Sequence, residues 1–468
     1  MAEPHYDVVI IGSGPGGYVG AIRAGQLGLK TALVEKDPFQ GGTCLHRGCI
    51  PTKALLENAA RLQDIVHASE FGLAVGELKV DWTKVQDRKT GIVRDLARGV
   101  GGLLKKWKVE VIQGWGRIEG PREVGIYEGP EGARIRTLAA RNIVIATGSV
   151  PREIASAPFD GERIVSSDHV LELQRVPGSM VVIGAGAVGV EFASIYHAFG
   201  TKVIVVEALP HLLPIEDDEV SAELARAFKK RKIDVHTSTM LHSARRDGEK
   251  VRVELSGEGA GEIETDVLLV AIGRAPVTAG IGIENVRVET DRGYVQVDEW
   301  CETSEPGVYA IGDVVPTPLL AHVASMEGVM VVERIAGKDV RPVPYGETPN
   351  CTYCDPEVAS VGLTERAARA EGRDVKVGKF PFLASGRAKI AGHTEGFVKI
   401  VADAKYDEIL GVHIVGYKAT ELIAEAGAVL RLEGTVGELI QTIHAHPTLA
   451  ESIHEAAHAA AHGAALHF

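Results

Sequence analysis

Residues 6–17 read YDVVIIGSGPGG, an apolar run that passes directly into a glycine-rich turn. A helix-forming segment follows, and a second apolar run ends at Glu35. In a strand–turn–helix–strand unit of this kind, Gly12 permits the tight turn, Gly14 lets a pyrophosphate approach the backbone, and Gly17 lets the helix pack on the strand. The acid at the end of the second strand can accept a hydrogen bond from a ribose hydroxyl. The stretch therefore predicts a dinucleotide-binding fold.

The same unit recurs at residues 179–207, where the first apolar run passes into GAGAVG and the second ends at Glu207. The three glycines of this second copy are Gly184, Gly186 and Gly189. In both copies the acid stands 23 positions after the first glycine (12 to 35, 184 to 207), so the chain is predicted to bind two dinucleotides. Glu207 would repel a 2′-phosphate, and residues 208–213 contain no Arg or Lys to bind one. The second site is therefore expected to prefer NAD over NADP.

Residues 41–53 read GGTCLHRGCIPTK and contain two cysteines separated by four residues. Two sulfurs so spaced can bridge only when their Cα atoms come within about 7 Å, so we expect Gly48 and Pro51 to distort the first turn of the helix that follows. A helix N-terminus favours a thiolate, because unpaired N–H groups and the positive end of the dipole gather there. Cys44 and Cys49 are therefore predicted to form a dithiol/disulfide redox centre. The alternative is a structural disulfide or two buried thiols.

Length, charge and cysteine content exclude several classes of protein. A chain of 468 residues predicts several domains. The net charge of -13 and the absence of a polybasic stretch argue against nucleic acid as a partner. No apolar run is long enough for a membrane span, and the first residues lack the pattern of a signal peptide. We therefore expect a soluble, cytoplasmic protein. Five cysteines are too few for a disulfide scaffold, so any disulfide is expected to turn over.

Three further apolar runs end in glycine or polar residues. The run at 142–149 is expected to return the chain to the first sheet, and the run at 266–276 to close the second fold. The run at 307–313 ends in Asp313, which is positioned to bond a chain of sugar-like hydroxyls or is an ordinary helix N-cap. The residues singled out at these ends are Thr147, Gly148, Gly273, Arg274 and Asp313.

From about residue 348 the pattern becomes mixed, with strands expected at 358–362 and 396–401 and helices from 419 and 436 onward. This texture predicts an α+β domain. A redox dithiol needs a group that takes and returns a proton near neutral pH, and His446, oriented by Glu451, supplies one. The alternative is a structural histidine in the turn before the last helix.

Taken together, these motifs resemble the flavoprotein disulfide reductases, and within that family the branch that oxidises dihydrolipoamide. The resemblance covers nearly the full length of the chain. It implies an α/β protein with two Rossmann-like dinucleotide-binding domains, a central domain and a C-terminal α+β dimerisation domain. The implied ranges are 1–149 for the FAD-binding domain, 150–276 for the NAD-binding domain, 277–347 for a central domain contacting FAD, and 348–468 for the dimerisation domain.

The resemblance also implies roles for single residues. Substrate would attack Cys44, Cys49 would face the flavin, and His446 would act in the partner subunit of a homodimer. Lys53 and Glu191 match a lysine–glutamate pair beside the flavin. Each glycine-rich turn with its flanking strands and acid (residues 6–35 and 179–207) is called a dinucleotide fingerprint. Cofactor contacts are further implied at the glycines and acids of both fingerprints and at Thr147, Gly148, Gly273, Arg274 and Asp313. The implied partners are dihydrolipoamide on a lipoyl domain and the acyltransferase core subunit of a 2-oxoacid dehydrogenase complex, with a glycine cleavage complex as the other setting.

Several other residues are read as structural. His46 stands where the family often has asparagine, and it is expected to face the loop between the cysteines. Cys351 and Cys354 form a lone CxxC, which cannot by itself make a four-ligand zinc site, so buried thiols are expected there and at Cys301. Three histidines spaced four apart on the last helix are read as an exposed face rather than a metal site; they are His454, His458 and His462.

Other classes of function fit the sequence less well. A glutathione-type reductase would need NADP and basic residues after the second fingerprint. Mercuric reductases and large thioredoxin reductases carry a further C-terminal redox pair, whereas this sequence ends AALHF. A non-catalytic flavoprotein that serves as a scaffold is a rival from another class. The intact cysteine pair, His446 and Glu451 argue against scaffolding as the sole role.

Overall fold

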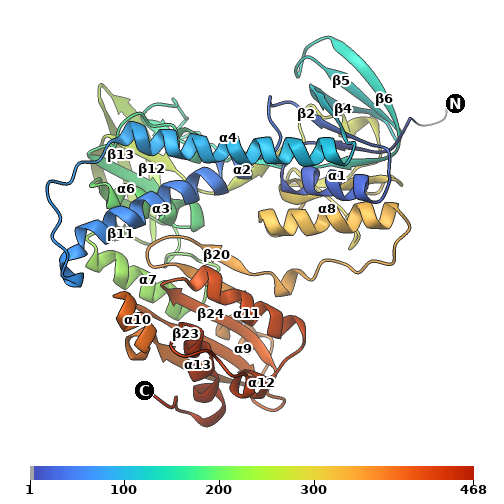
Figure 1. Cartoon of the computed structure of the whole chain (residues 1–468). Coiled ribbons are helices and arrows are strands. Elements are labelled where there is room, and N and C mark those ends of the chain that lie inside the picture. Colours follow the sequence, from blue (N-terminus) through green and yellow to red (C-terminus); the bar gives the residue numbers. More distant parts are fainter. Residues whose placement is uncertain (1–4) are drawn as a thin grey trace. The chain divides into compact units, whose positions relative to one another are not determined.

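The computed structural model describes residues 5–468, which form two compact units (Figure 1). Unit 1 comprises the chain up to Ala54 together with Thr83–Arg152 and Arg274–Tyr345. Unit 2 comprises Leu55–Trp82, Glu153–Gly273 and Gly346–Phe468. Each unit therefore gathers segments that lie far apart in the sequence. Helices α3 (Cys49–Val66) and α4 (Trp82–Lys106) contribute residues to both units.

The core of unit 1 is a mixed sheet. Parallel strands run in the order β3-β2-β1-β6, and β19 is parallel to the C-terminal half of β6. The N-terminal half of β6 pairs antiparallel with β5, which pairs with β4. The strands are β1 (Tyr6–Ile11), β2 (Thr31–Glu35), β3 (Glu110–Gln113), β4 (Trp115–Gly120), β5 (Glu123–Tyr127), β6 (Arg134–Ile145) and β19 (Val308–Ala310). Strand β2 is buried throughout, as expected of a parallel strand covered on both faces.

Helices α1 (Pro15–Gln26) and α8 (Ala321–Ile335) pack side by side in unit 1 (Figure 1). Glycines bring the two backbones close together, because a Cβ atom on Gly328 would lie 2.4 Å from the carbonyl oxygen of Gly16. A Cβ atom on Gly20 would lie 3.2 Å from the carbonyl oxygen of Gly328. The glycines of α1 therefore serve helix packing as well as the turn before the helix.

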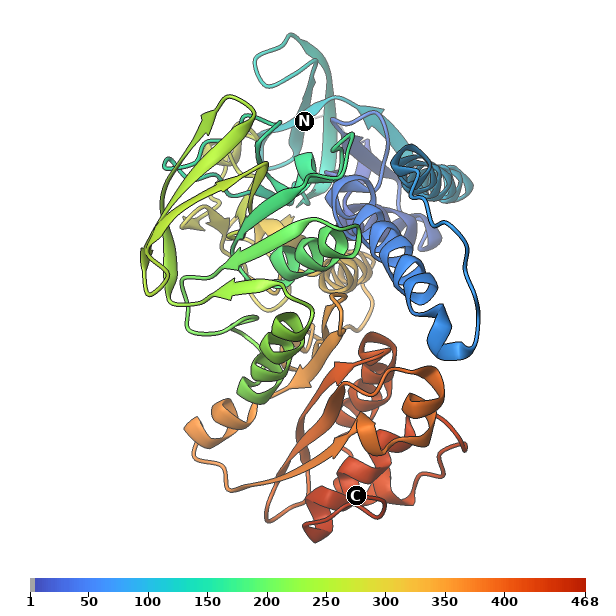
Figure 2. The same ribbon diagram turned by 90° about the vertical axis from the view of Figure 1, so that its left-hand side faces the viewer.

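Unit 2 contains a second parallel sheet, with strand order β11-β10-β9-β15-β8, which carries the second fingerprint (Figure 2). The strands are β8 (Ile164–Val165), β9 (Ser179–Ile183), β10 (Lys202–Val206), β11 (Asp234–His236) and β15 (Val267–Val270). Helices α5 (Ser167–Val170), α6 (Ala187–Ala198) and α7 (Asp218–Lys230) accompany this sheet. An antiparallel sheet of β12 (Thr239–Asp247), β13 (Lys250–Gly257) and β14 (Gly261–Thr265) extends the second fold.

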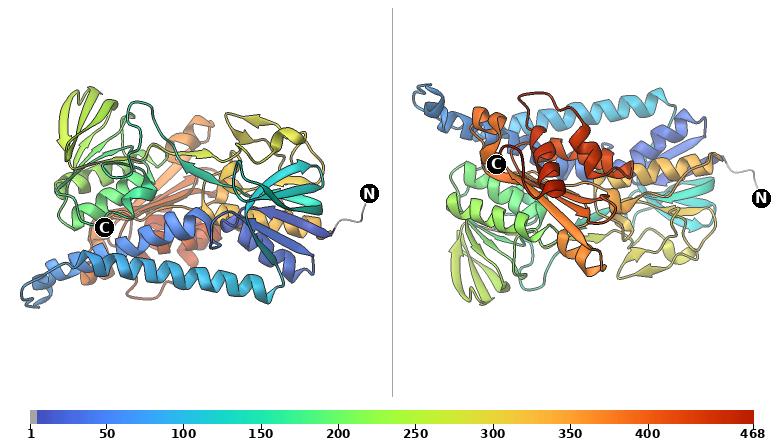
Figure 3. Two further views of the ribbon diagram at one scale, coloured as in Figure 1. Left: turned by 90° about the horizontal axis from the view of Figure 1, so that it is seen from above. Right: turned by 90° about the horizontal axis from the view of Figure 1, so that it is seen from below.

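The C-terminal part of unit 2 is an antiparallel sheet with strand order β20-β21-β24-β23-β22. Its strands are β20 (Asn350–Thr352), β21 (Val358–Gly362), β22 (Val375–Pro381), β23 (Gly396–Asp403) and β24 (Ile409–Gly416). The accompanying helices are α9 (Glu365–Ala370), α10 (Gly386–Ala391), α11 (Ala419–Arg431), α12 (Val436–Gln441) and α13 (Glu451–His462). Alternate sheet residues such as Val398, Ile400 and Ile414 share one apolar core with α11, α12 and α13. The ribbon of this C-terminal part is seen from below in the right-hand view of Figure 3. The intervening residues therefore point to the opposite face.

The expected α/β architecture, with two Rossmann-like folds and a C-terminal α+β part, is confirmed. The strands expected at 358–362 and 396–401 are β21 and the first part of β23. One feature of the sheet was not predicted from sequence. Strand β19 joins the first sheet beside β6, although more than 160 residues separate Ile145 from Val308.

Candidate active site

The glycines of the first fingerprint differ in the space around them. Gly12 has a φ of +101°, and a Cβ atom there would lie 2.3 Å from the carbonyl oxygen of Ala146. A Cβ atom on Gly17 would lie 1.9 Å from the carbonyl oxygen of Gly12. No atom lies within 4 Å of the Cβ position at Gly14. Gly12 and Gly17 are therefore required by close packing, whereas Gly14 borders open space at the start of α1.

The second fingerprint repeats this pattern. Gly184 has a φ of +100°, and its Cβ position lies 2.5 Å from the carbonyl oxygen of Ala271. The Cβ position at Gly189 lies 1.9 Å from the carbonyl oxygen of Gly184, and that at Gly186 has no atom within 4 Å. Neither α1 nor α6 has a side-chain N-cap. Both helix starts thus present backbone N–H groups beside open space, which fits the pyrophosphate of a dinucleotide.

The two acids hold the turns from the ends of β2 and β10. Oε2 of Glu35 accepts hydrogen bonds from the backbone N–H of Ser13 at 2.8 Å and from its hydroxyl at 2.5 Å. Oε2 of Glu207 accepts one from the backbone N–H of Ala185 at 2.7 Å. Each acid also accepts the N–H two residues further on, from Asp37 and from Leu209, at 2.9 Å. Both carboxylates are buried and face the fingerprint turn, where a ribose hydroxyl would lie.

Cys44 and Cys49 lie on two successive helices. Cys44 is in α2 (Gly42–Arg47), and Cys49 is the first residue of α3. Gly48, with φ −142° and ψ −110°, separates the helices, so the expected distortion is a complete break before Cys49. A hydrogen bond with Cys49 and burial raise the pKa of the Cys44 thiol, and the Lys53 cation opposes them. The two thiols are therefore in contact, and their contact favours the protonated form of Cys44.

The redox loop, residues 41–49, is hydrogen-bonded to the turn of the first fingerprint. The N–H of Gly41 donates to the carbonyl oxygen of Ser13 at 2.9 Å, and a Cβ atom on Gly42 would lie 2.5 Å from Cα of Gly14. Tyr18, on α1, lies near both cysteines; burial raises its pKa most, and any negative charge on the neighbouring sulfurs raises it further. The sequence reading missed Ser13 and Tyr18. The only signal for them was their position within the glycine-rich turn and the helix after it.

Three segments meet at Ser149, the first residue of β7 (Ser149–Pro151), which pairs with β16 (Arg274–Pro276). The Ser149 hydroxyl donates to Oδ2 of Asp313 at 2.6 Å. Nε of Arg274 donates to the Ser149 hydroxyl oxygen at 2.6 Å and lies 3.7 Å from Oδ2 of Asp313. The hydroxyl of Thr147 donates to the carbonyl oxygen of Val277 at 2.6 Å. The structure thus brings Arg274 and Asp313 together.

The carboxylate of Glu451 orients His446 at the start of α13. Nδ1 of His446 lies 2.8 Å from Oε1 of Glu451. Oε2 of Glu451 accepts the N–H of Thr448 at 2.7 Å. Burial raises the pKa of Glu451, but the bonds from Thr448 and His446 outweigh it and the pKa is lowered. The His446 side chain is 82% exposed in the single chain, so its imidazole is presented outward in a fixed orientation.

The remaining predicted residues have these positions. Lys53 belongs to unit 1, and its positive charge partly offsets the rise in the pKa of Cys44. Glu191 is buried on α6 of unit 2 and accepts a hydrogen bond from the backbone N–H of Tyr353 at 2.9 Å. Gly148 and Gly273 have positive φ angles. Nε2 of His46 lies 3.0 Å from the Gln40 carbonyl oxygen, in the redox loop as expected.

Two of the structural expectations need correction. Cys301 and Cys354 are buried, but Cys351 is only half-buried, because its strand β20 lies at the edge of the sheet. His454 and His458 are half-buried rather than exposed, since α13 packs on β22 and β23 and on α12. Among residues 5–468, no cluster of three or more His, Cys, Asp or Glu side chains has the geometry to hold a metal ion. Within the same residues, no helix is long and apolar enough to cross a membrane.

Residues 6–328 match the model of the pyridine nucleotide-disulphide oxidoreductases, and residues 348–457 match the dimerisation domain of that family. The chain is 45% identical to a dihydrolipoyl dehydrogenase of Bacillus subtilis, with 99% of each chain covered, and 44% identical to one of Zymomonas mobilis, with 100% of each covered. The crystal structure of LpdA from Mycobacterium tuberculosis superposes with a TM-score of 0.89 at 28% identity, covering 96% of this chain and 98% of that one.

The chain therefore belongs to the pyridine nucleotide-disulphide oxidoreductase family, a class of FAD-containing enzymes with a redox disulfide. The curated relatives that match it over their whole length are dihydrolipoyl dehydrogenases, which use FAD and NAD. The chain is thus an oxidoreductase that works with FAD and NAD, and its C-terminal domain makes it a homodimer-forming subunit.

Proposed function

We propose that this protein oxidises dihydrolipoamide, carried on a lipoyl domain, to lipoamide and transfers the electrons to NAD. The observation that carries the proposal is the contact between the Cys44 and Cys49 thiols, on a loop bonded to the first fingerprint turn. A dithiol in this place can exchange with a substrate dithiol of similar chemistry. The full-length similarity to dihydrolipoyl dehydrogenases supports the lipoyl group as that substrate.

The thiol chemistry balances in two displacement steps. In the first, a substrate thiolate attacks the sulfur of Cys44 in the oxidised enzyme, the Cys44–Cys49 bond breaks, and Cys49 leaves as a thiolate. In the second, the other substrate thiol attacks the mixed disulfide and Cys44 leaves, which releases lipoamide and a reduced enzyme. Cys49 suits the role of first leaving group, because it is the first residue of α3 and a helix N-terminus favours an anion there.

His446 is proposed to take the proton of the first substrate thiol, to give it to Cys44 when that sulfur leaves, and then to take the proton of the second substrate thiol. Glu451 holds Nδ1 at 2.8 Å, so Nε2 is the nitrogen left to act as base. The imidazole of His446 belongs to the dimerisation domain and is exposed in the single chain. We therefore propose that His446 completes the site of the partner subunit.

The residues that would hold the cofactors follow from the two open fingerprint turns. Gly12, Gly14, Gly17 and Glu35 would hold FAD, with Thr147, Gly148, Arg274, Asp313, Lys53 and Glu191 as further contacts. Gly184, Gly186, Gly189, Glu207 and Gly273 would hold NAD. FAD bound by these residues would supply the two-electron chemistry that links the reduced dithiol to NAD. Ser149 and Arg274 hold Asp313 in place, and its carboxylate would accept hydrogen bonds from the hydroxyl groups of a sugar-like chain.

The wider setting belongs to the same proposal. The domain ranges 1–149, 150–276, 277–347 and 348–468 are the proposed FAD-binding, NAD-binding, central and dimerisation domains. The proposed assembly partner is the acyltransferase core subunit of a 2-oxoacid dehydrogenase complex, or the corresponding glycine cleavage component. A cytoplasmic location is proposed because a dithiol that turns over suits a reducing compartment.

A comparison of substrates tests the proposal. Purified FAD-loaded protein is assayed with NAD and NADP, each paired with dihydrolipoamide, reduced glutathione or reduced thioredoxin. We expect the highest kcat/KM with dihydrolipoamide and NAD. A higher kcat/KM with either of the other thiols, or with NADP, would show that the assignment of the substrate or of the second site is wrong.

A further inference from the structure

A row of polar residues crosses the C-terminal sheet of unit 2. One residue of each strand contributes, and each is the direct cross-strand partner of the next: Asn350 (β20), Ser360 (β21), His413 (β24), Lys399 (β23) and Lys379 (β22). Directly paired residues share one face of a sheet. Their neighbours Val398, Ile400 and Ile414 belong to the apolar core with α11 to α13, so this polar row lies on the other face.

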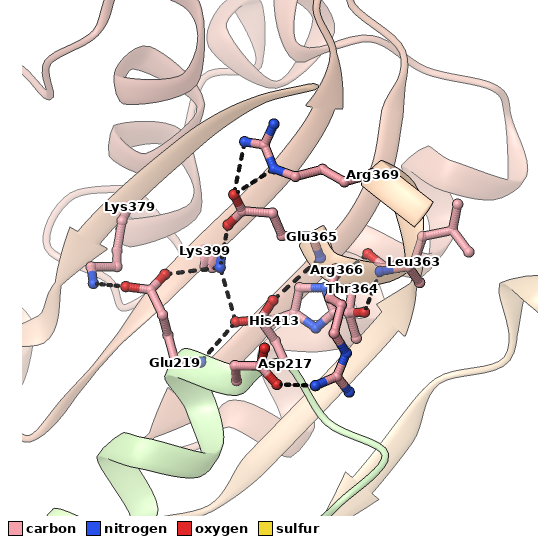
Figure 4. Close-up of polar contacts among 12 residues, drawn as sticks. Asp217, Glu219, Leu363, Thr364, Glu365, Arg366, Arg369, Lys379, Lys399 and His413 are labelled. Atoms are coloured by element: carbon pink, nitrogen blue, oxygen red, sulfur yellow. Dashed lines mark hydrogen bonds and ion pairs between the residues drawn. The ribbon is translucent and has the colours of Figure 1, made fainter. Parts of the chain in front are cut away.

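An acidic strap, residues 216–219, contacts this polar row at β20, β23 and β22. The Asn350 side-chain amide donates to Glu216 at 2.5 Å. Nζ of Lys399 lies 2.9 Å from Asp217 and 2.8 Å from Glu219, and Nζ of Lys379 lies 2.6 Å from Glu219 (Figure 4). The strap begins the helix α7 of the second nucleotide-binding fold. The C-terminal domain therefore holds one defined segment of that fold.

Lys399 is the central contact of the polar row. Its ammonium group, 2% exposed, also meets Glu365 of α9 at 2.8 Å, so each of its N–H groups has a carboxylate partner. Asp217 is equally buried and serves as the N-cap of α7. Removing the cation would leave Asp217 buried beside the other carboxylates without a countercharge, which is strongly unfavourable. The strap would then have to move toward water.

The strap is continuous with the NAD-binding turn. Only residues 208–215 separate it from Glu207, which accepts the N–H of Ala185 in the second fingerprint at 2.7 Å. Midway, the N–H of Leu213 donates to the carbonyl oxygen of Ala185 at 2.9 Å, and the N–H of Glu216 donates to that of Leu213 at 2.9 Å. Leu213 has a φ of +45°, a left-handed conformation that a leucine rarely adopts without such support.

We propose that Lys399, through the acidic strap, is a positioning residue for NAD, so that the C-terminal domain sets the shape of the nucleotide-binding turn. This inference rests on the proposed function only in placing NAD at the second fingerprint. When the Lys399 ammonium group is removed, the strap moves and the hydrogen bonds that fix Leu213, Ala185 and Glu207 weaken. NAD then binds less tightly, while the thiol chemistry at Cys44 and Cys49 is unchanged.

The test uses Lys399→Met in the FAD-loaded homodimer and separates the two half-reactions. The dissociation constant of NADH is measured by equilibrium binding, and anaerobic reduction by dihydrolipoamide is followed in a single turnover without NAD. We expect the NADH dissociation constant to rise about tenfold, because a binding site displaced by about 1 Å loses affinity steeply. The rate of reduction by dihydrolipoamide should change less than about twofold, since the supporting contacts of the dithiol are untouched.

A matched control is Lys376→Met, which removes a lysine of β22 that pairs with Asp407 outside the polar row. It should leave both measurements unchanged. An unchanged NADH dissociation constant in folded Lys399→Met, or an equal loss in both half-reactions, overturns the inference. If Lys399→Met does not fold, Glu365→Gln takes its place, with an expected two- to threefold rise in the dissociation constant; no rise overturns the inference. Failure of the proposed function is distinct, because wild-type protein would then not be reduced by dihydrolipoamide.

Discussion

The two nucleotide-binding folds of this chain follow the same path as far as the loop after the acid. Six residues after the acid, a backbone N–H donates to the carbonyl oxygen of the residue that follows the first fingerprint glycine. The pair is Gly41 with Ser13 in the first fold and Leu213 with Ala185 in the second, both at 2.9 Å. Both bonded residues have a positive φ, 126° for Gly41 and 45° for Leu213. The loop that leaves each acid is therefore fixed to its own fingerprint turn.

The folds differ three residues later. Nine positions after the acid stands Cys44 in the first fold (35 to 44) and Glu216 in the second (207 to 216). Cys44 is half-buried beside a second thiol, whereas Glu216 is 1% exposed and bonded to Asn350 of the C-terminal sheet. The same loop path can therefore hold a thiol of the proposed redox pair or a structural carboxylate, depending on the side chain and on what covers it.

The largest effect is expected from Cys44→Ser. A hydroxyl cannot replace the sulfur that forms the mixed disulfide, so dihydrolipoamide–NAD turnover should fall by about 10⁴-fold or more. Steady-state assays measure this, and the NADH dissociation constant should stay unchanged because the second fold is intact. Glu216→Gln, at the equivalent position, should keep most of the activity. Near-normal turnover in Cys44→Ser would show that the dithiol mechanism is wrong.

A second prediction asks whether the first loop is sufficient for its chemistry. His446→Gln should lower kcat by about 10²–10⁴-fold, as expected for loss of a general base, and Glu451→Gln by less, because Glu451 only orients the ring. Mixing His446→Gln chains with Cys44→Ser chains should restore activity, since one site of the mixed dimer has both the thiols and the histidine. If mixed dimers form and stay inactive, His446 acts within its own subunit or is not the base.

The third prediction applies one substitution to both folds. Glu35→Gln and Glu207→Gln each replace a charged acceptor of backbone N–H groups by a neutral one. Loss of charge-assisted bonds to the turn and the ribose should weaken binding about tenfold, of FAD in the first case and of NADH in the second. Reconstitution with FAD and equilibrium binding of NADH measure the two effects. Weakening of the same cofactor by both substitutions would contradict the assignment of one nucleotide to each fold.

The smallest expected effect concerns Glu216. Burial raises the pKa of this carboxyl above its ordinary value of 4.5. A group with a raised folded-state pKa lowers stability as the pH rises through that pKa, because the ionised form is better solvated in the unfolded chain. Glu216→Gln cannot ionise, so its melting temperature should exceed that of the wild type by about 2 °C at pH 8. Thermal melts should show this gain shrinking toward pH 4; a gain that grows on acidification would contradict the buried, protonated acid.

Much of the fold and of the site could be predicted because the signals are local. Gly12 has a φ of +101°, and Gly17 contacts the carbonyl oxygen of Gly12 five positions earlier, so a single stretch of sequence specifies both. The cysteine pair and the His446–Glu451 pair likewise lie within five positions of each other. The helix break between Cys44 and Cys49 was predicted only as a distortion, because the sequence does not specify the backbone angles that Gly48 adopts.

The two dinucleotide folds, the cysteine pair and the proposed base could all be inferred from the sequence alone, since each depends on backbone geometry or side-chain chemistry confined to one short segment. Which distant groups meet depends on the tertiary structure. Asp313 joins Ser149 across 164 positions, and Lys399 joins Asp217 across 182. From the sequence alone, a lysine within an apolar strand is not expected to be buried. Lys399 can be buried because three carboxylates from other segments surround its ammonium group.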